Sequence, residues 1–474
     1  MKLNRKSLLL AALLSVPLAA CSASGTSQTP VASASSAVPA PKAKKVILFI
    51  GDGMGISTIT AARIYAGQKQ GQSGEEYVLP FETFDNVALV KTYNVNAQVP
   101  DSAGTASAMH TGLKTNIGML GVGPATPHGD CEAALANRLP TLGEQAIERG
   151  LALGIVSTAR ITHATPAAVY AHSPDRDWEA FIGTEGQANK GCRDIATQLV
   201  ESEFDLALGG GRAAFYGPDR NGWRRDGAVD LPAAWVARTG GTYVETAAQL
   251  AAAPADKPVL GLFSPSHMTY TVDRKPDSSE PTLTEMTAQA IARLDNDPDG
   301  YYLMVESGRI DHGHHAGQAG YALEEAVEFA NAIQYAIDHT DPADTLILVT
   351  ADHSHVFTMS GYPRRGNDIL GLVHSPAGGE GEAGGDGPSL ANDGKPYTTL
   401  GYGNGPGSIA NLAERPMPET GVKAHQQATI PLGSETHGGE DVALYGHGPG
   451  AERVRGVIEQ NVIYDIIVKA LGWK

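Results

Sequence analysis

Short, continuous apolar runs alternate along the chain with longer amphipathic segments. We expect buried strands at residues 46–50 (VILFI), 153–157 (LGIVS), 205–208 (DLAL), 302–305 (YLMV) and 345–349 (TLILV). Helical periodicity separates these runs, as in residues 141–150 (TLGEQAIERG) and 322–339 (ALEEAVEFANAIQYAIDH). Continuous apolar strands that alternate with helices are typical of a parallel sheet covered on both faces. The pattern therefore predicts an α/β fold with a mostly parallel central sheet and helices on both faces.

Three of the predicted strands run directly into acidic residues. Asp52 follows the first strand, Glu306 follows the run at 302–305, and Asp352 with His353 follows TLILV. Right-handed connections bring the carboxyl ends of parallel strands to one edge of a sheet. Three carboxylates at one edge would repel each other unless cations bind among them. The sequence therefore predicts a metal centre at this edge.

The stretch ESGRIDHGHHAG, residues 306–317, is unusually rich in acids and histidines. Asp311 and His315 are four residues apart, which places both on one face of a helix. An aspartate and a histidine are good zinc ligands that need a third partner from elsewhere. His437, in SETHGGED, is a candidate. A single histidine would be interpreted as structural, and we assign no role to His314 or His355.

Ser102 lies in VPDSAGTASAMHTG, residues 99–112, where it follows an acid and precedes a run of small residues. Such a run predicts a helix, and a helix N-terminus binds phosphate well. The alternative is that Ser102 only caps the helix. The nearby GDGMG at 51–55 is a weak dinucleotide signal, because Ile56 stands where the last glycine of that motif belongs.

Composition and net charge limit the kinds of partner and substrate that the protein can bind. The 474 residues are 42% hydrophobic and 18% charged, which is ordinary for a globular protein. The formal net charge of −17 argues against nucleic acid as a partner, because no basic stripe is present to neutralise phosphates. A small anionic substrate is still compatible with this charge, since bound dications reverse the local potential.

The N-terminus has the features of a targeting segment. Basic MKLNRK is followed by apolar SLLLAALLSVPLA, which is too short to span a bilayer comfortably. The tetrad LAAC resembles the lipobox of bacterial lipoproteins, which are cleaved before the cysteine and lipidated on it. We therefore expect a lipoprotein signal peptide at 1–20, a lipid anchor on Cys21 and a flexible Ser/Ala/Pro-rich tether at 21–43. The alternative is an ordinary signal peptide with Cys21 incidental.

Export also bears on the two remaining cysteines. We expect a periplasmic or outer-membrane lipoprotein of a bacterium, and exported chains favour disulfides. Cys131 and Cys192 allow one pairing. Closing a loop of about 60 residues would contribute roughly 4 kcal/mol in the chain-entropy model. The alternative is two free, buried thiols.

Several separate segments together resemble the alkaline phosphatase family. They are ILFIGDGMG, VPDSAGTASA, THATPAAVYAHSPDRDW, VESGRIDHGHH, VTADHSHVF, GYGNGPG and ETHGGEDVALYGHGP. The resemblance runs from about residue 44 to the C-terminus and implies one catalytic domain at 44–474 with an alkaline-phosphatase-like fold. It also implies a homodimer and a crown-like insertion at about 361–431, in which the Gly-rich residues 375–394 form a surface loop.

The resemblance implies metal-dependent hydrolysis of small phosphate monoesters through a phosphoserine, with two Zn²⁺ and one Mg²⁺. Ser102 matches the nucleophile and Arg176, in SPDRDW, matches the arginine that clamps phosphate. The implied ligands are Asp311, His315 and His437 for one zinc; Asp52, Asp352 and His353 for the other; and Asp52, Thr165 and Glu306 for magnesium. Two metal ions can stabilise both the attacking and the leaving oxygen of an in-line displacement.

The chain departs from some family members around the third metal. His163 and His312 stand where some bacterial members have Asp and Lys, and animal members have histidines there too. We expect both to lie near the metal without ligating it. Animal members also carry a calcium site with an acid in GLFE, but this chain has Ser264 in that place, so the calcium site is not expected.

Three other functions fit the sequence less well. A phosphodiesterase of the same superfamily usually has a threonine nucleophile and lacks the combination of Ser102 with Arg176. A sulfatase needs a C-x-P-x-R motif, which none of the three cysteines provides. A metal-holding lipoprotein without catalysis would not need either Ser102 or Arg176.

Overall fold

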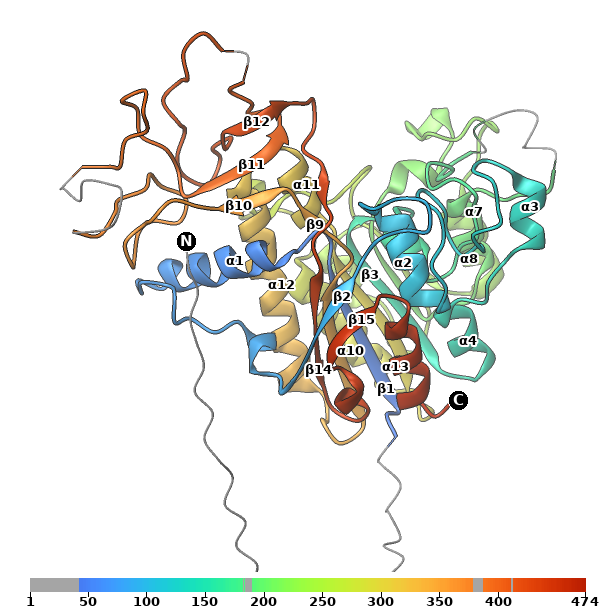
Figure 1. Ribbon diagram of the computed structural model, residues 1–474. Helices are drawn as coiled ribbons and strands as arrows, with labels where there is room; N and C mark the ends of the chain where they lie inside the picture. The colour runs from blue at the N-terminus through green and yellow to red at the C-terminus, as the bar shows by residue number, and fades with distance from the viewer. Residues whose placement is uncertain (1–41, 182, 184–189, 378–386, 411) are drawn as a thin grey trace, which may run out of the picture. The chain divides into compact units, whose positions relative to one another are not determined.

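The largest sheet in the described part of the chain has ten strands, in the order β15-β2-β14-β8-β1-β7-β3-β4-β6-β5 (Figure 1). The strands are β1 Lys45–Gly51, β2 Asn86–Lys91, β3 Ala152–Arg160, β4 Leu206–Gly210, β5 Thr242–Val244, β6 Val259–Leu262, β7 Tyr301–Ser307, β8 Thr345–Ala351, β14 Val442–His447 and β15 Gly456–Glu459. Only β14 runs antiparallel to its neighbours, β2 and β8, among these described strands. The predicted mostly parallel sheet is confirmed.

The coordinates are a computed structural model that describes residues 42–181, 183, 190–377, 387–410 and 412–474. The folded unit is Ala40–Lys474. The predicted signal peptide at 1–20, Cys21 and nearly all of the predicted tether lie outside the described residues, as does the middle of the loop at 375–394. No helix in the described ranges combines the length and the apolar character that a membrane span requires.

All five strands expected from the apolar runs are present, as β1, β3, β4, β7 and β8. The helices are α1 Ile56–Lys69, α2 Ser102–Thr111, α3 Cys131–Ala136, α4 Leu142–Glu148, α5 Ala164–Ala167, α7 Ile195–Glu201, α8 Leu231–Thr239, α9 Ala247–Ala252, α10 Leu283–Leu294, α11 Arg309–His315, α12 Ala319–His339 and α13 Val462–Ala470. The two helices expected from periodicity are therefore present as α4 and α12.

Helices cover both faces of the sheet, as two adjacent residues of β3 show. Leu153 faces α4, where a Cβ on Gly143 would lie 3.3 Å from its side chain. The next residue, Gly154, faces α10, where an added Cβ would lie 2.6 Å from Leu294. Successive strand residues point to opposite faces, so α4 and α10 lie on opposite sides of the sheet.

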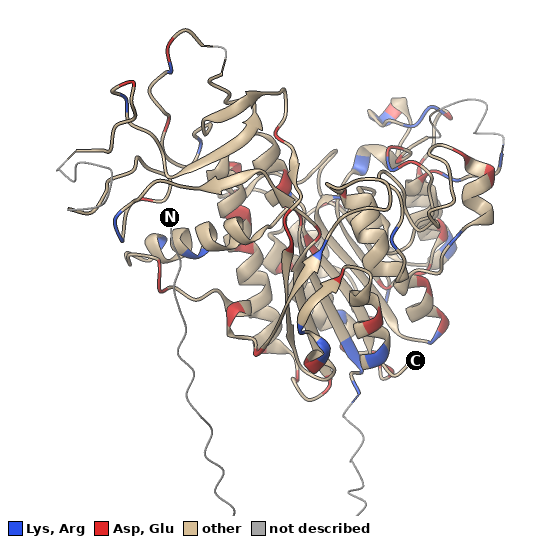
Figure 2. Cartoon of the chain, in the orientation of Figure 1, with Lys and Arg blue, Asp and Glu red and all other residues tan. Residues whose placement is uncertain are grey.

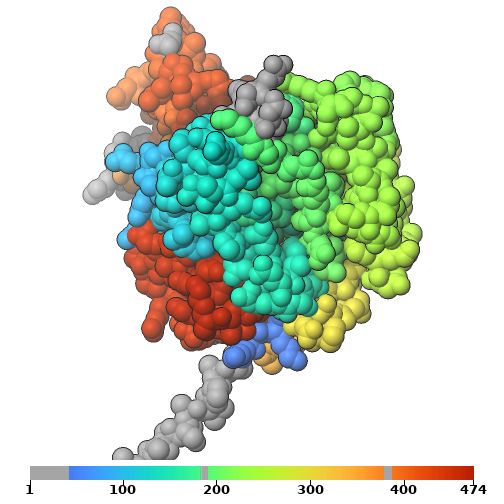
Figure 3. Space-filling model, turned by 90° about the vertical axis from the view of Figure 1, so that its right-hand side faces the viewer, coloured from blue at the N-terminus to red at the C-terminus, as the bar shows by residue number. Residues whose placement is uncertain are grey.

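The C-terminal segment packs beside the central helices. Helix α13 contacts α2, and α2 contacts α4. Figure 3 shows the cyan-to-teal surface of α2–α4 between the red C-terminal surface and the green surface that contains α7 and α8. The C-terminal segment therefore supports the helix that begins at Ser102.

Two smaller sheets lie beyond the carboxyl ends of the central strands. One contains β10 Phe357–Met359, β11 Leu400–Gly405 and β12 Ala428–Pro431. It lies at the upper left of Figure 1. The other is a short pairing of β9 Ser354–His355 with β13 His437–Gly438, and it brings His437 opposite His355. Because of this pairing, His437, which is distant from β8 in the sequence, lies at the edge of the sheet where β8 ends.

Cys131 and Cys192 form a disulfide with a Cα–Cα distance of 5.7 Å. The predicted pairing is confirmed. It links the first residue of α3 to the segment that precedes α7.

Figure 2 shows acidic and basic residues interspersed over the described helices, strands and loops.

Glu325 on α12 is a buried carboxyl group whose stability effect depends on pH. It is 2% exposed and accepts a hydrogen bond from the backbone N–H of Thr271 at 2.6 Å. Burial raises the pKa of Glu325 from 4.5 to about 7. Because the folded state binds this proton more tightly than the unfolded state, stability falls as the pH rises from about 4.5 to about 7 and then stays low.

We expect Glu325→Gln to remove this penalty, since an amide oxygen can still accept from Thr271. The free energy of unfolding should increase by about 1–3 kcal/mol at pH 8 and change little at pH 4.5. Chemical denaturation of both proteins at the two pH values measures this. Glu328→Gln is the matched control, because Glu328 lies on α12 like Glu325 and accepts from the backbone N–H of Thr284 on α10, but is only partly buried. Equal shifts at both pH values would contradict the account.

Candidate active site

Three acids meet where neighbouring strands end. Strand β1 lies between β7 and β8, and both pairings are parallel, with Gly51 opposite Ser307 and Ala351. Asp52, Glu306 and Asp352 therefore lie at adjacent carboxyl ends, and each is fully buried. This is the convergence that the sequence pattern predicts.

The glycine after Asp52 explains the GDGMG segment. Gly53 has a φ of +67°, in the left-handed region that favours glycine. A Cβ there would lie 2.3 Å from Nε2 of His355, and the Gly53 N–H donates to Oδ1 of Asp352 at 3.0 Å. The glycine thus lets the backbone turn tightly around the acid cluster, which is a different role from binding a dinucleotide.

A first group of ligand atoms comes from α11 and β13. Nε2 of His315 lies 3.3 Å from Oδ1 of Asp311, one helical turn away. Nε2 of His437 lies 3.4 Å from the same oxygen and 3.1 Å from Nε2 of His315. The structure therefore brings together the three residues that the family resemblance assigns to one zinc.

The outer nitrogens of these histidines fix their tautomers. Nδ1 of His315 donates to the carbonyl of Glu435 at 2.6 Å, and Nδ1 of His437 donates to the carbonyl of Pro100 at 2.8 Å. In the neutral rings, both Nε2 atoms are then lone-pair acceptors that face each other. Such an arrangement is repulsive by itself and is typical of metal-ligating histidines, whose other nitrogen donates to a carbonyl. The donor set fits a cation.

A second group surrounds the side chain of Ser102. Nε2 of His353 lies 3.4 Å from Oδ1 of Asp52 and 3.4 Å from Oδ2 of Asp352. The Ser102 hydroxyl lies 3.0 Å from that nitrogen and 3.4 Å from Oδ1 of Asp52. Ligand atoms of Asp52, Asp352 and His353 all lie within 4.8 Å of one another.

A third group contains buried oxygens that lack a hydrogen-bond partner within the described ranges. They are Oδ2 of Asp52, Oγ1 of Thr165 and Oε1 of Glu306. Unpaired buried oxygens are costly, and a bound cation would satisfy all three. The fit of these oxygens to Mg²⁺ is good, because that ion prefers oxygen ligands.

The two neighbouring histidines differ in how close they come to this group. A ring nitrogen of His163 lies within 4.8 Å of ligand atoms of Asp52 and Glu306. Its Nε2 lies 3.1 Å from the guanidinium of Arg176. His312 is more distant: its ring centroid lies 5.6 Å from that of His163, and its Nδ1 accepts from Arg309 at 3.1 Å.

The pKa values of the buried acids show the cost of this clustering without cations. Burial, together with the charges of Asp352, Asp311 and Glu306, raises the pKa of Asp52 well above its ordinary value. Burial raises the pKa of Glu306 to about 7. For Asp311, burial opposes ionisation, but the surrounding histidines outweigh it and hold the pKa well below its ordinary value. A cation among these groups would favour the ionised forms.

Ser102 is the first residue of α2, and the residue that caps this helix is Asp101. The Asp101 carboxylate accepts from the backbone N–H of Gly104 at 3.1 Å, so the alternative interpretation of Ser102 as the cap is wrong. The other Asp101 oxygen accepts from Arg176 at 3.0 Å. The residue before Ser102 therefore fixes Arg176 beside it. Burial opposes the charge of Arg176, but the nearby acids keep its pKa above the ordinary value.

Sequence reasoning missed His355, Glu435 and Asp101. His355 is buried, with Nε2 2.9 Å from Oδ1 of Asp311 and Nδ1 facing the Glu435 carboxylate. Its spacing of two from His353 along an extended segment is the only local signal. His314, by contrast, bonds to Thr58 at 3.0 Å and Tyr402 at 2.9 Å, a structural role.

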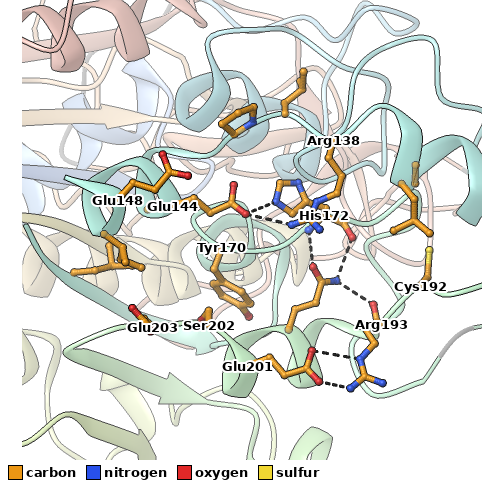
Figure 4. Close-up of a pocket in the computed structure, with 18 of the residues that line it drawn as sticks. Arg138, Glu144, Glu148, Tyr170, His172, Cys192, Arg193, Glu201, Ser202 and Glu203 are labelled. Carbon is orange, nitrogen blue, oxygen red and sulfur yellow. Dashed lines mark hydrogen bonds and ion pairs between the residues drawn. The ribbon is translucent and has the colours of Figure 1, made fainter. Parts of the chain in front are cut away.

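A cavity of about 620 Å³ lies apart from these groups, between α3, α4 and α7 (Figure 4). None of the candidate metal or catalytic residues lines it. Several of its polar side chains pair with each other: Glu144 contacts His172 and Arg138, and Arg193 contacts Glu201. The chemistry of the site therefore lies at the strand ends rather than in this cavity.

The fold and the site define a metal-dependent hydrolase of the α/β type. The sequence profile of the family described as Alkaline phosphatase matches residues 43–473. The tissue-nonspecific alkaline phosphatase of Gallus gallus is 44% identical over 450 residues, covering 89% of this chain and 83% of the relative. The alkaline phosphatase of Gadus morhua is 43% identical over 446 residues, covering 89% and 90%.

Solved structures agree with this result. The alkaline phosphatase of Thermus thermophilus superposes with a TM-score of 0.68 at 26% identity, covering 92% of each chain. The enzyme of the Antarctic bacterium TAB5 superposes with a TM-score of 0.63 at 24% identity, covering 92% of this chain and 99% of that one, which supports the fold. The chain belongs to the alkaline phosphatase family.

Proposed function

We propose that this enzyme hydrolyses phosphate monoesters to an alcohol and inorganic phosphate through a phosphoserine at Ser102. The observation that carries the proposal is the position of the Ser102 hydroxyl, 3.0 Å from His353 and 3.4 Å from Asp52. A nucleophilic oxygen thus lies at the edge of the candidate metal cluster and at a helix N-terminus. Relatives that share 44% and 43% of their aligned residues with this chain are alkaline phosphatases.

In the first step the Ser102 hydroxyl loses its proton to solvent and its Oγ attacks phosphorus, the bond from phosphorus to the ester oxygen breaks, and the departing alkoxide takes a proton from solvent. In the second step water attacks the phosphoserine, the bond from phosphorus to Oγ breaks, and Ser102 regains its proton. Splitting the reaction in this way replaces one difficult displacement with two easier ones. The first-turn N–H groups of α2 favour the negative charge that both steps place beside Ser102.

Asp311, His315 and His437 are proposed to hold one Zn²⁺, and Asp52, Asp352 and His353 a second. Asp52, Thr165 and Glu306 are proposed to hold Mg²⁺, with His163 and His312 nearby. When bound, these ions would stabilise the negative charge on the attacking, leaving and non-bridging oxygens. Nitrogen and oxygen donors suit the zinc sites, and oxygen donors alone suit magnesium.

Arg176 is proposed to bind two non-bridging phosphate oxygens. Its guanidinium is already oriented by Asp101 at 3.0 Å and by His163 at 3.1 Å. A planar guanidinium offers parallel N–H donors that a lysine cannot reproduce. Because Asp101 directly precedes Ser102, the phosphate-binding group and the nucleophile are held by one short segment.

Turnover of a chromogenic phosphate monoester beside the matching diester tests the proposal. We expect the monoester to be hydrolysed much faster under matched conditions, a chelator to abolish turnover, and Zn²⁺ with Mg²⁺ to restore it. Faster turnover of the diester would instead favour the phosphodiesterase alternative. Full activity after verified removal of all metal would contradict the metal-dependent function.

The location and assembly of the enzyme are part of the proposal. Export by the segment at 1–20, lipidation of Cys21 and a tether at 21–43 would hold the catalytic domain at 44–474 near a bacterial membrane, in the periplasm or on the outer membrane. The support is the LAAC tetrad, and the intact mass of the mature chain tests it. An unmodified N-terminus would refute the anchor.

A homodimer is proposed as well. Neighbouring strands β2 and β15 present exposed apolar side chains, with Leu89 37%, Val87 47% and Val457 57% exposed. Exposed apolar patches of this kind mark interaction surfaces. The insertion at 361–431, which contains β11 and β12, is proposed to form the crown expected from the family resemblance. Sedimentation equilibrium tests the dimer, and a monomeric mass would refute it.

A further inference from the structure

Glu435 is a buried acid that stands two residues before His437. Its side chain is fully buried. One carboxylate oxygen accepts from the backbone N–H of Val356 at 2.8 Å, and the other faces Nδ1 of His355. A buried carboxylate with both oxygens engaged is rigidly oriented.

His355 connects Glu435 to Asp311, because its ring contacts both carboxylates. Its Nε2 lies 2.9 Å from Oδ1 of Asp311, so the ring stands between two carboxylates. Carboxylate oxygens accept, and therefore both ring nitrogens donate. The Glu435 side chain thus fixes the direction in which Asp311 presents its oxygens.

The backbone of Glu435 acts on a second ligand. Its carbonyl accepts from Nδ1 of His315 at 2.6 Å, and its N–H donates to the carbonyl of His315 at 3.0 Å. One residue therefore contacts His315 directly and Asp311 through His355, and it is joined by two peptide units to His437. The positions of all three proposed ligands of the first zinc are therefore linked to the position of Glu435.

We infer that Glu435 is a positioning residue that sets the Zn²⁺ affinity of the site formed by Asp311, His315 and His437. The inference rests on the proposed function, because it takes the ligand assignment from there. Removal of a hydrogen-bond partner of a metal ligand typically weakens metal binding 10- to 100-fold. Glu435→Gln keeps the volume and one acceptor but removes the charge that faces His355.

The test is a competitive Zn²⁺ titration of the metal-free enzyme against a chromogenic chelator. We expect Glu435→Gln to bind one Zn²⁺ about 10- to 100-fold more weakly and to leave the second site within about threefold of the wild type. Turnover should recover at saturating Zn²⁺. The matched control is Glu440→Gln, because Glu440 follows β13 as Glu435 precedes it, and it accepts from the hydroxyl of Ser354, beside His355. Its Zn²⁺ affinities should equal those of the wild type.

A double-mutant cycle with His355→Gln shows whether Glu435 acts through His355. The two substitutions should each weaken the same site, and their combination should add little, because they interrupt one relay. Full additivity, or wild-type affinity in Glu435→Gln, would overturn the inference. Equal weakening of both zinc sites with a lower unfolding temperature of the metal-free enzyme would also overturn it, because that is a general structural effect. A wild-type chain that binds no Zn²⁺ would instead refute the proposed function.

Discussion

Ser102→Ala is expected to lower kcat for a phosphate monoester by about 10³- to 10⁵-fold while leaving the bound metal unchanged. The substitution removes the oxygen that lies 3.0 Å from Nε2 of His353. It removes no member of the proposed ligand sets, and alanine is an excellent helix former at the start of α2. Steady-state kinetics and metal analysis of the purified variant measure the two effects separately.

Ser107→Ala is the matched control for this experiment. Ser107 is a buried serine on the same helix, but its hydroxyl donates to the carbonyl of Met119 at 3.0 Å. Its loss should cost about 1 kcal/mol of stability and change kcat by only a few-fold. A Ser102→Ala enzyme that keeps more than a tenth of wild-type turnover would show that another group is the nucleophile.

Asp52→Asn is expected to have opposite effects on the metal-free and the metal-loaded enzyme. Burial and three neighbouring acids raise the pKa of Asp52, so its ionised form destabilises the metal-free fold at neutral pH. The amide removes that penalty, and the metal-free variant should unfold at a higher temperature than the wild type. The same change removes the carboxylate shared by the proposed second zinc and magnesium sites, and kcat should fall by about 10²- to 10⁴-fold.

Thermal unfolding of both proteins, after chelation and after loading with Zn²⁺ and Mg²⁺, measures this crossover. Asp205→Asn is the control outside the site, since Asp205 is an exposed acid directly before β4 that accepts from the backbone N–H of Leu153 at 2.8 Å. Its substitution should alter both states of the enzyme equally. An Asp52→Asn variant that binds metal like the wild type would contradict the assignment of Asp52.

The core of the sheet could be predicted because its signal is local. Strands β1, β7 and β8 are continuous apolar runs, and their order along the chain suffices to place the acids that follow them at one edge. Strand β2 was not predicted because it is not a continuous apolar run: its residues alternate, with Val87 and Leu89 exposed. Strand β14 was not predicted because its position depends on pairing with distant residues: Leu444 lies opposite Thr350 in β8 and opposite Ala88 in β2.

The same difference between local signals and distant contacts explains which site residues could be predicted from the sequence. Asp311 and His315 lie one helical turn apart, so spacing alone brings them together. Glu435 contacts His355 across 80 positions of the chain, and Asp101 contacts Arg176 across 75. No periodicity in the sequence encodes such contacts, because they arise only when β13 pairs with β9 and when α2 packs beside α5.

The position of the phosphoryl group in the covalent intermediate tests the central claim most directly. The enzyme is mixed with a phosphate monoester, quenched in acid within its first turnovers, digested and mapped by mass spectrometry. We expect one phosphate on the peptide that contains Ser102, and none on the same peptide from Ser102→Ala. Phosphate on another residue, or rapid turnover with no trapped phosphate, would contradict it.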